Sequence, residues 1–286
     1  MRDRKLIAVM GTTASGKTDL AESLADERGA QLINADAFQV YRHMDIGTAK
    51  SPRKSEYKLI DIREPNESFG VGEWIRNAYE VLSTTKQDVV IVGGTGLYIR
   101  ALFEEFDDLA SAPDPDLRLE LNEKSLEDLL KQLEERNPVA HAKVDQKNRV
   151  RVQRAVERSY SSQKLTVPDL SGFVKVKFWL DRDSEDVQKR IENRAQQMVE
   201  VGWIDEVETI RNLGYKIDDP GLRAHGYRHI WQVVEGTMKI EEALSLTTME
   251  VKRYAKRQRT WLRKEPGLIR IEPNESAHDA LMAHLK

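Results

Sequence analysis

Short apolar runs alternate with amphipathic stretches through roughly the first hundred residues of the chain. Four of these runs have the length of buried strands: residues 5–10, 31–35, 57–62 and 88–94. Between them, residues 18–29 place Leu20 and Leu24 on one helical face, and residues 68–85 repeat the pattern with larger apolar side chains. This alternation of strands and helices predicts an α/β fold with a parallel sheet flanked by helices.

The pattern changes after the fourth predicted strand. An acidic, proline-containing connector leads into several helical segments, and a strand over residues 174–181 then returns. More helices follow, and a last short strand is predicted at residues 268–272. We therefore predict a core of residues 1–103 and 171–286, interrupted by an inserted helical domain at residues 104–170.

Composition narrows the function classes. The 286 residues are enough for one or two domains, with 40% apolar and 33% charged residues. The absence of cysteine excludes a disulfide framework, a thiol nucleophile and a cysteine-based zinc site, and the six histidines lack metal-ligand spacing. No signal peptide precedes the first strand, and no apolar run approaches the ~20 residues that span a bilayer. We therefore expect a cytoplasmic protein without a membrane partner, and the net charge of −3 does not by itself point to nucleic acid.

The segment GTTASGKT, residues 11–18, fits the phosphate-loop pattern G-x-x-x-x-G-K-[ST] through Gly11, Gly16, Lys17 and Thr18. The glycines let backbone N–H groups point into one concavity, Lys17 adds a mobile positive charge, and the Thr18 hydroxyl is a ligand for Mg²⁺. The loop follows a predicted strand and opens a predicted helix, whose N-terminus favours an anion. The motif predicts polyphosphate binding and leaves open whether the ligand is a nucleotide.

Two further segments are expected at the same edge of the sheet. Asp36 ends the second predicted strand, so we expect it near the transferred group, although a turn carboxylate or helix cap is an equally good interpretation. The fourth strand ends in Gly93, Gly94 and Thr95, where a phosphate-loop hydrolase would often carry an aspartate. These residues offer room for a flat ligand and one hydroxyl, or simply a tight turn, and they argue against a motor-type ATPase.

Basic residues cluster on two predicted helices. Arg151, Arg154 and Arg158 fall on one face of the first helix. A separate pair, Arg190 and Arg194, is spaced by one helical turn and is expected nearer the sheet. The second helix carries a longer basic stripe with interleaved aromatics: Lys252, Arg253, Tyr254, Lys256, Arg257, Arg259, Trp261 and Arg263. Arginines with aromatics are typical of surfaces that bind phosphates and unstacked RNA bases, whereas a solvated helix face is the alternative.

Together these segments resemble the tRNA dimethylallyltransferase family, also called tRNA isopentenyltransferases. The resemblance extends in family order over nearly the whole chain. It is carried by residues 11–18, 34–50, 57–69, 92–98, 151–157, 190–207, 226–229 and 254–263. The block QVYRHMDIGTAK within residues 34–50 is specific to this family, whereas phosphate loops alone are not. The resemblance implies a P-loop NTPase-like core with an inserted helical domain that binds the anticodon stem-loop.

The resemblance also implies the reaction, transfer of a dimethylallyl group from dimethylallyl diphosphate to N6 of an adenosine beside the anticodon of tRNA, by a monomer. Asp36 would accept the amine proton, Thr95 would hydrogen-bond the base, and Thr18 would bind Mg²⁺. The residues implied for the diphosphate are Gly11, Thr12, Thr13, Ala14, Ser15, Gly16, Lys17, Thr18, Arg118 and Arg194. Those implied for tRNA are Asp36, Ala37, Phe38, Gln39, Thr95, Arg118, Arg151, Arg154, Arg223, Gly226, Tyr227, Arg228 and Arg257.

The chain departs from the family's usual residues at a few positions: Thr12, Ala37, His43, His225 and His229. Three other functions share part of the pattern. A small-molecule or nucleoside kinase would use the same loop with Asp36 as base, and a related prenyltransferase would act on free AMP, ADP or ATP. An RNA-binding scaffold with a vestigial loop is the non-enzymatic alternative, and the intact Lys17, Thr18, Asp36 and Thr95 argue against it.

Overall fold

The apolar runs of the sequence form strands of one parallel sheet in the computed structural model, which describes residues 4–104, 114–160, 170–274 and 276–285. The chain divides into two compact units. The first consists of Met1–Gly70, Trp74–Phe103 and Asp169–Lys286, and the second of Val71–Glu73 and Glu104–Pro168. The sheet and the phosphate loop belong to the first unit.

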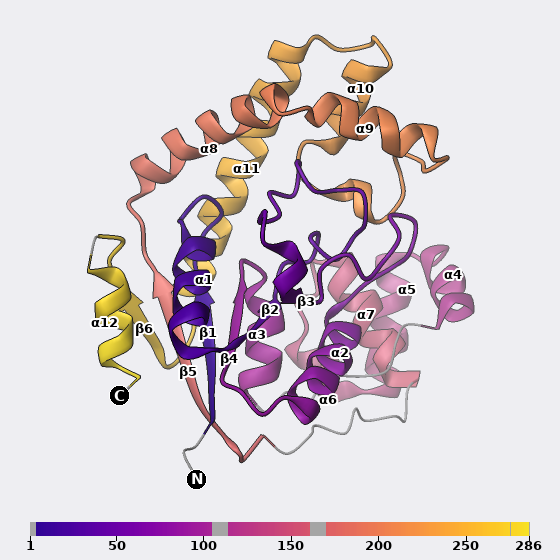
Figure 1. Cartoon of the computed structure of the whole chain (residues 1–286). Helices are drawn as coiled ribbons and strands as arrows, with labels where there is room; N and C mark the ends of the chain where they lie inside the picture. The colour runs from indigo at the N-terminus through magenta and orange to yellow at the C-terminus, as the bar shows by residue number, and fades with distance from the viewer. Residues whose placement is uncertain (1–3, 105–113, 161–169, 275, 286) are drawn as a thin grey trace. The chain divides into compact units, whose positions relative to one another are not determined.

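Within the described residues, the sheet has six strands, all parallel, in the order β3-β2-β4-β1-β5-β6 (Figure 1). The strands are β1 (Arg4–Met10), β2 (Gln31–Asn34), β3 (Tyr57–Lys58), β4 (Val89–Gly93), β5 (Phe173–Leu180) and β6 (Leu268–Ile271). The central strands β1 and β4 are apolar at consecutive positions because both of their faces are covered, as is usual in parallel sheets. The predicted parallel α/β fold is therefore confirmed.

The strand predicted at residues 57–62 is wrong beyond its first two residues. β3 ends at Lys58, and Leu59 and Asp61 both have positive φ angles, of 65° and 55°. A backbone in the left-handed region cannot continue an extended strand. The Asn34 side chain fixes this turn by donating a hydrogen bond from Nδ2 to the Leu59 carbonyl oxygen, over 2.9 Å.

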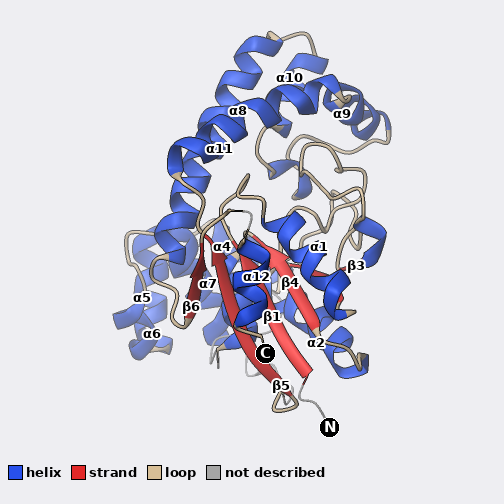
Figure 2. Cartoon of the chain, turned by 60° about the vertical axis from the view of Figure 1, so that its left-hand side comes forward, coloured by secondary structure: helices blue, strands red, loops and turns tan. Residues whose placement is uncertain are grey.

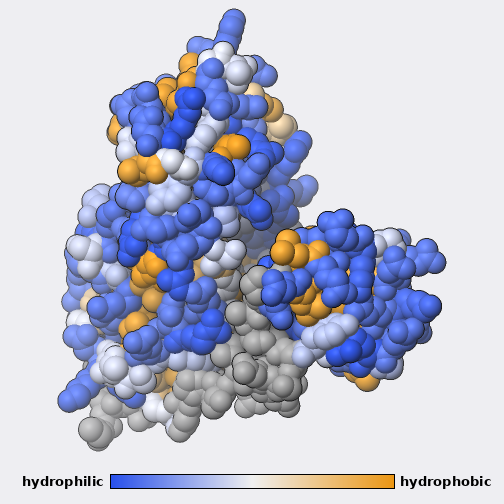
Figure 3. Space-filling model, turned by 90° about the vertical axis from the view of Figure 1, so that its right-hand side faces the viewer, coloured by the Kyte–Doolittle hydropathy of each residue, from blue (hydrophilic) through white to orange (hydrophobic). Residues whose placement is uncertain are grey.

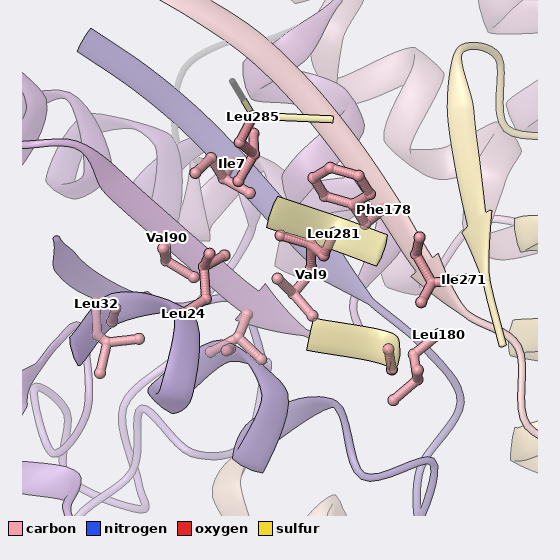
Figure 4. Close-up of a cluster of buried hydrophobic side chains, with 14 of the residues drawn as sticks. Ile7, Val9, Leu24, Leu32, Val90, Phe178, Leu180, Ile271, Leu281 and Leu285 are labelled. Atoms are coloured by element: carbon pink, nitrogen blue, oxygen red, sulfur yellow. The ribbon is translucent and has the colours of Figure 1, made fainter. Parts of the chain in front are cut away.

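One face of the sheet is covered by α1 (Lys17–Arg28) and α12 (Ala277–Ala283), which come from opposite ends of the chain. Figure 4 shows the buried side chains of these helices meeting those of the strands: Ile7, Val9, Leu24, Leu32, Val90, Phe178, Leu180, Ile271, Leu281 and Leu285. α1 ends as predicted at Gly29, which takes a left-handed φ of 59°. Two further helices are α2 (Val71–Thr84), in which Trp74, Ala78 and Leu82 are buried, and α3 (Gly96–Phe103).

A helical layer lies beyond the carboxyl ends of the strands, as Figures 1 and 2 show from two directions. It consists of α8 (Ser184–Glu200), α9 (Trp203–Asn212), α10 (Tyr227–Val234) and the upper part of α11 (Ile240–Leu262). These helices enclose a second apolar cluster around Trp203 and Tyr227, which also takes in Val40, Tyr41 and Met44 of the segment after β2. This layer therefore holds the segment over the end of the sheet where β1, β2 and β4 finish.

The second unit is helical in its described residues. Its helices are α4 (Pro115–Asn122), α5 (Leu126–Arg136), α6 (Pro138–Lys143) and α7 (Arg149–Tyr160). Leu121, Leu129, Leu133 and Val152 form its apolar centre. Ser125 starts α5 with a capping box, in which the Ser125 side chain and Asp128 satisfy each other's backbone N–H groups. This unit therefore has a small hydrophobic core of its own.

The surface shown in Figure 3 is mostly hydrophilic, and its apolar residues gather in small groups. In the part of the chain that the structure describes, no helix combines the length and the apolar character needed to cross a membrane.

Leu281 on α12 tests how far the C-terminal helix supports the sheet. Its side chain is fully buried, so Leu281→Ala leaves a cavity between α12, α1 and the strands. We expect the free energy of unfolding to fall by about 2–5 kcal/mol in urea denaturation. Leu213→Ala is the matched control, because Leu213 is 54% exposed, and it should change stability by less than about 0.5 kcal/mol. Equal effects of the two substitutions would contradict the packing of α12.

Candidate functional site

A pocket of about 190 Å³ lies in the first unit at the carboxyl ends of β1, β2 and β4. Its walls come from the phosphate loop, the segment after β2, and helices α8 and α11. Ligands of open parallel sheets bind at this edge, where neighbouring loops diverge. The pocket therefore occupies the place that the sequence predicts for the functional site.

The phosphate loop has the strand–loop–helix context that its motif requires. It begins after Met10 at the end of β1, and α1 begins at Lys17. Gly16 has a φ of +89°, a conformation that side chains with a Cβ rarely adopt. A Cβ on Gly11 would lie 2.5 Å from Ser15 Oγ and 3.2 Å from the Leu180 carbonyl oxygen, so this glycine is needed for close packing. The structure thus explains why both positions of the motif are glycine.

Two arginines, one just after β5 and one on α8, bind backbone carbonyl groups of the phosphate loop. Arg182 Nε donates to the Ser15 carbonyl oxygen over 2.8 Å, and Arg190 Nε donates to the Ala14 carbonyl oxygen over 2.9 Å. These bonds occupy carbonyl groups of the loop, which would otherwise repel an anion. Lys17 Nζ donates a long hydrogen bond, 3.3 Å, to the Thr12 carbonyl oxygen.

Two cations inside the pocket are poorly solvated. Burial lowers the pKa of the Lys17 ammonium to about 8, while the charge of Asp36 raises it and that of Arg194 lowers it. Burial also lowers the pKa of Arg194, with a smaller contribution from Arg190 in the same direction, while Asp19 raises it. A bound polyanion would reverse both effects, since an opposite charge nearby stabilises the protonated form. The predicted roles of Lys17 and Arg194 therefore agree with their surroundings.

The structure brings Asp36 and Thr95 together in the same region. Asp36 lines the pocket, and one of its carboxylate oxygens accepts a hydrogen bond from the Phe38 backbone N–H over 2.9 Å. Thr95 Oγ1 accepts a hydrogen bond from the Ala37 backbone N–H over 3.1 Å. The turn that follows β2 thus has a polar link to the turn that follows β4. Ala37 enters this arrangement through its backbone, without needing a side chain.

Sequence analysis missed the part that α11 plays here. Gln258 Oε1 accepts a hydrogen bond from the Thr13 N–H over 2.8 Å, and Gln258 Nε2 donates to the Gly94 carbonyl oxygen over 3.0 Å. Tyr254, one turn earlier, lines the pocket, and its phenol is hydrogen-bonded to Gln258 and Thr95. The only signal in the sequence is that these two residues interrupt the basic stripe at helical spacing.

The glycines after β4 make room for protein atoms. A Cβ on Gly93 would collide with the backbone of Ala35, and one on Gly94 with the side-chain amide of Gln258. A Cβ on Gly96 would enter the ring of Trp261. The interpretation of Gly94 as space for a flat ligand is therefore wrong, because Gln258 fills that space.

The segment after β2 is fixed by internal hydrogen bonds. Gln39 Nε2 donates to the carbonyl oxygens of Thr48 and Ala49, over 3.0 and 3.2 Å. The Glu206 carboxylate accepts hydrogen bonds from three consecutive backbone N–H groups: Asp45 at 2.6 Å, Ile46 at 2.6 Å and Gly47 at 3.1 Å. Phe38 is half-buried and lines the pocket. Gln39 is thus bound within the loop, and both Gln39 and Phe38 line the pocket.

Two residues implied for tRNA serve the core of the first unit. The Tyr227 side chain is fully buried, and its hydroxyl donates to Glu206 over 2.7 Å. Gly226 begins α10 with a φ of +89°, and a Cβ there would collide with Trp203. The enclosed Tyr227 phenol thus packs inside the first unit, and a tRNA contact by the segment of residues 226–229 stays a prediction.

The basic stripe of α11 is only partly on the surface. Arg259 Nη1 lies 3.3 Å from Asp181, and Lys252 pairs with Glu192 over 2.5 Å. The ring of Trp261 packs against Gly96 and under the Arg100 guanidinium, 4.5 Å away. Arg257, in contrast, is exposed. Arg223 and Arg228 are exposed as well, although Arg228 pairs with Asp218 over 3.0 Å.

In the second unit, a buried carboxylate holds two of the predicted site residues. Arg118 forms two 2.8 Å hydrogen bonds to Glu157, and Arg154 Nη1 lies 2.7 Å from the same group. The Glu157 side chain is 3% exposed, so removal of its arginine partners would leave a buried charge unpaired. Arg151 differs, because its side chain is 67% exposed and its distance to Asp145 is 3.5 Å.

The protein supplies few ligands for a metal ion. Among the described residues, no group of three or more His, Cys, Asp or Glu side chains is arranged to hold one. Mg²⁺ in phosphate sites takes one or two protein ligands and completes its shell with water and phosphate oxygens. Thr18 lines the pocket at the start of α1, so its hydroxyl fits such a role when a diphosphate is bound.

Comparisons with known proteins agree with one another. A family model described as IPP transferase matches residues 39–265, and one described as isopentenyl transferase matches residues 4–61. The tRNA dimethylallyltransferase 2 of Geotalea daltonii is 36% identical, with 94% of this chain and 87% of that protein covered. The crystal structure of the tRNA isopentenylpyrophosphate transferase of Bacillus halodurans is similar with a TM-score of 0.71, 31% identity and coverage of 99% and 97%.

A third similarity supports the fold alone. A eukaryotic dimethylallyltransferase crystallised acting on tRNA has a TM-score of 0.80 at 20% identity, covering 98% of this chain and 77% of that one.

Lys17 should take up protons when the pocket binds a diphosphate. With a pKa of about 8 in the free protein, roughly half of the Lys17 side chains are neutral at pH 8 and almost none at pH 6.5. A bound anion raises this pKa, so inorganic pyrophosphate should bind with an uptake of about half a proton at pH 8. Isothermal titration calorimetry in buffers of different ionisation enthalpy measures the uptake.

The difference between wild type and Lys17→Met isolates this proton, because the protons of pyrophosphate itself contribute in both. Lys264→Met, at an exposed lysine beyond α11, is the control and should behave as wild type. Equal uptake by wild type and Lys17→Met would rule out Lys17 as the group that responds to the anion.

Proposed function

The chain belongs to the IPP transferase family, and from this premise we propose that it is a tRNA dimethylallyltransferase. The donor is dimethylallyl diphosphate, and the acceptor is the exocyclic N6 of an adenosine next to the anticodon. One observation carries the proposal: a single pocket combines poorly solvated cations at the phosphate loop with the carboxylate of Asp36. Since the proposed acceptor is tRNA, we expect the protein in the cytoplasm.

The pocket suits a small amphiphilic donor. Its basic end is formed by the phosphate loop with Lys17 and Arg194. Part of its wall is apolar: Ile60, Ile191, Ala195, Met198 and Val251. Dimethylallyl diphosphate has a dianionic or trianionic head and a five-carbon apolar chain, which match these two parts. We propose that the protein acts as a monomer.

The leaving group is stabilised at the phosphate loop. When the allylic C–O bond breaks, the carbon gains positive charge and the departing diphosphate gains negative charge. N–H groups at the start of α1, together with Lys17 and Arg194, would stabilise that negative charge without reorganising. A Mg²⁺ ion held by Thr18 and the diphosphate oxygens would supply further neutralisation.

The acceptor side needs a base and an anchor. Adenine N6 is a weak nucleophile because its lone pair is delocalised into the ring. As it forms the new C–N bond it must lose one of its two protons to give the neutral secondary amine. Asp36 lines the pocket and would take this proton. Thr95 Oγ1 lies at the turn after β4, where its contact with the Ala37 N–H leaves its own proton to donate. We assign to it the orientation of the extruded base.

Exposed cations support tRNA as the acceptor. Arg223 and Arg257 are exposed on the first unit, and Arg151 is exposed on the second. We propose that the helical second unit binds the anticodon stem-loop through phosphate contacts, because arginines on a helix face suit that backbone.

The direct test is incubation with radiolabelled dimethylallyl diphosphate and unmodified tRNA, with AMP, ADP and ATP as acceptors in parallel reactions. We expect label in tRNA alone, and N6-dimethylallyladenosine after nuclease digestion. Label in a free nucleotide would favour a prenyltransferase of small acceptors, and Lys17-dependent consumption of ATP would favour a kinase.

Asp36 should be essential for transfer and dispensable for binding. Asp36→Ala removes the group that accepts the amine proton, and loss of a positioned base lowers the rate by about 10²–10⁴-fold. We expect this loss in single-turnover prenyl transfer, with tRNA affinity within a few-fold of wild type in filter binding. Asp205→Ala, at an exposed carboxylate on α9, is the control. Transfer by Asp36→Ala at the wild-type rate would remove Asp36 from the mechanism.

Salt dependence should distinguish exposed arginines from paired ones. Each phosphate contact contributes a slope of roughly −0.7 to −0.9 to the dependence of log affinity on log salt. The double substitution Arg151→Gln and Arg257→Gln should therefore flatten the tRNA-binding slope by roughly one to two units. Arg154→Gln should change it much less, because Arg154 pairs with the buried Glu157. A slope that the double variant leaves unchanged would show that these arginines are ordinary solvated residues.

A further inference from the structure

Two histidines at the start of α10 share one carboxylate of α11. His225 directly precedes Gly226, the N-cap residue of α10, and His229 lies in the first turn of that helix. Glu250 lies between them: its Oε2 is 3.8 Å from His225 Nδ1, and its Oε1 is 3.2 Å from His229 Nε2. Both rings therefore face α11, which carries Glu250.

His225 also belongs to the wall of the pocket. Its ring lies against the ring of Tyr254, with centroids 4.9 Å apart and planes tilted by 48°. The Tyr254 phenol is in turn hydrogen-bonded to Thr95 and Gln258. A continuous series of contacts thus leads from Glu250 through His225 and Tyr254 to Thr95, which we assign to the acceptor base.

The charges around His225 oppose one another. Burial is the largest influence and lowers the pKa of its imidazole below the usual 6.5, and the positive charge of Arg257 acts in the same direction. The negative charges of Glu250 and Asp36 act the other way, as does a hydrogen bond with Glu250. Tyr254 contributes a neutral phenol, since burial and the charge of Asp36 raise its own pKa. The net effect is a lowered pKa, so His225 takes up its proton at a lower pH than a solvated imidazole does.

We propose that His225, oriented by Glu250, is a positioning residue for the acceptor base: its neutral ring supports Tyr254 against Thr95, and its protonation slows prenyl transfer. This role rests on the proposed function of the pocket.

Protonation slows the reaction for an electrostatic reason. An imidazolium at His225 places positive charge in a pocket where the allylic carbon itself becomes positive. It also stabilises the carboxylate form of Asp36, which makes Asp36 a weaker acceptor for the amine proton. Both effects lower kcat at acid pH, and neither changes the contacts of the diphosphate with the phosphate loop.

The first experiment measures kcat and KM for prenyl transfer to tRNA between pH 5 and 8. We compare wild type with His225→Leu, which keeps a bulky apolar side chain and removes the titrating group, and with Glu250→Gln. In wild type, kcat should fall as the pH drops through the pKa of His225. In Glu250→Gln, loss of the charge that favours the imidazolium should shift this fall to lower pH by about one unit. In His225→Leu, this part of the pH dependence should disappear.

Truncation of the ring tests the packing role separately. His225→Ala removes the support of Tyr254 and should lower kcat at pH 7.5 by about tenfold to a hundredfold, with the KM for dimethylallyl diphosphate unchanged. His225→Leu should recover most of this loss, because it restores contact with the Tyr254 ring. Circular dichroism at each pH and thermal melting confirm that every variant is folded.

A matched histidine–glutamate pair in the first unit provides the control. His278 of α12 lies 3.3 Å from Glu27 of α1 and outside the pocket. Glu27→Gln should therefore leave the pH dependence of kcat as in wild type. An equal shift in Glu27→Gln and Glu250→Gln would overturn the proposal.

The second experiment needs no enzymatic activity. Ring signals of ¹³C-labelled histidines are followed by NMR through a pH titration, and the His225 signal is assigned by its absence in His225→Leu. Its pKa should lie below 6.5 in wild type and fall further in Glu250→Gln and in Asp36→Asn, but not in Glu27→Gln. A His225 pKa that is the same in wild type, Glu250→Gln and Asp36→Asn would overturn the proposal.

The two experiments separate this proposal from the proposed function. Wild type that transfers the dimethylallyl group, together with an unaltered acid dependence in His225→Leu, would overturn the role of His225 alone. Absence of transfer to tRNA by wild type at every pH would overturn the proposed function and the role of His225 in it.

Discussion

The pocket depends on the bridge that the Gln258 side chain makes between the phosphate loop and the turn after β4. A single amide group both accepts from Thr13 and donates to Gly94, so α11 must lie directly against both turns. This requirement explains why Gly94 carries no Cβ. It also sets the neighbours on α11: one turn earlier Tyr254 reaches Thr95, and one turn later Trp261 packs on Gly96. The donor and acceptor sides of the site therefore share one rigid support.

Near this bridge, the free protein keeps positively charged side chains out of water, which is unfavourable until an anion binds. Arg182 and Arg190 are satisfied by carbonyl groups of the loop, whereas Lys17 and Arg194 have pKa values lowered mainly by burial. Cations held out of water in this way bind a polyanion with little loss of hydration at the moment of binding. The same arrangement favours a transition state in which negative charge moves onto the diphosphate, because the donors are already in place.

Part of this site can be predicted from local sequence patterns. The rest depends on contacts between residues that are far apart in the sequence. The strand, loop and helix around residues 4–28 follow from neighbours in the sequence, and Asp36 and Thr95 follow from the rule that parallel strands end at one edge. Gln258 lies 245 residues from its partner Thr13, so no local spacing points to their contact. The intramolecular partners of Tyr227 and Arg118 are hidden for the same reason, because only the folded chain shows that Glu206 and Glu157 bind them. The strand predicted at residues 57–62 is longer than β3, because the pattern of apolar residues does not reveal the positive φ angles that follow Lys58.

Arginine content alone therefore says little about RNA binding in this chain. Several basic residues of the chain balance carboxylates that the fold has removed from water: Arg259 at Asp181, Arg118 at Glu157, and Arg100 with Lys177 at Glu265. Such pairs are costly to break, because the carboxylate would remain buried without a partner. These cations cannot turn toward a phosphate without destabilising the protein. The proposed recognition of tRNA then rests on the smaller set that is exposed, Arg151, Arg223 and Arg257 among them, and such local contacts do not require a positive net charge in a chain whose net charge is −3.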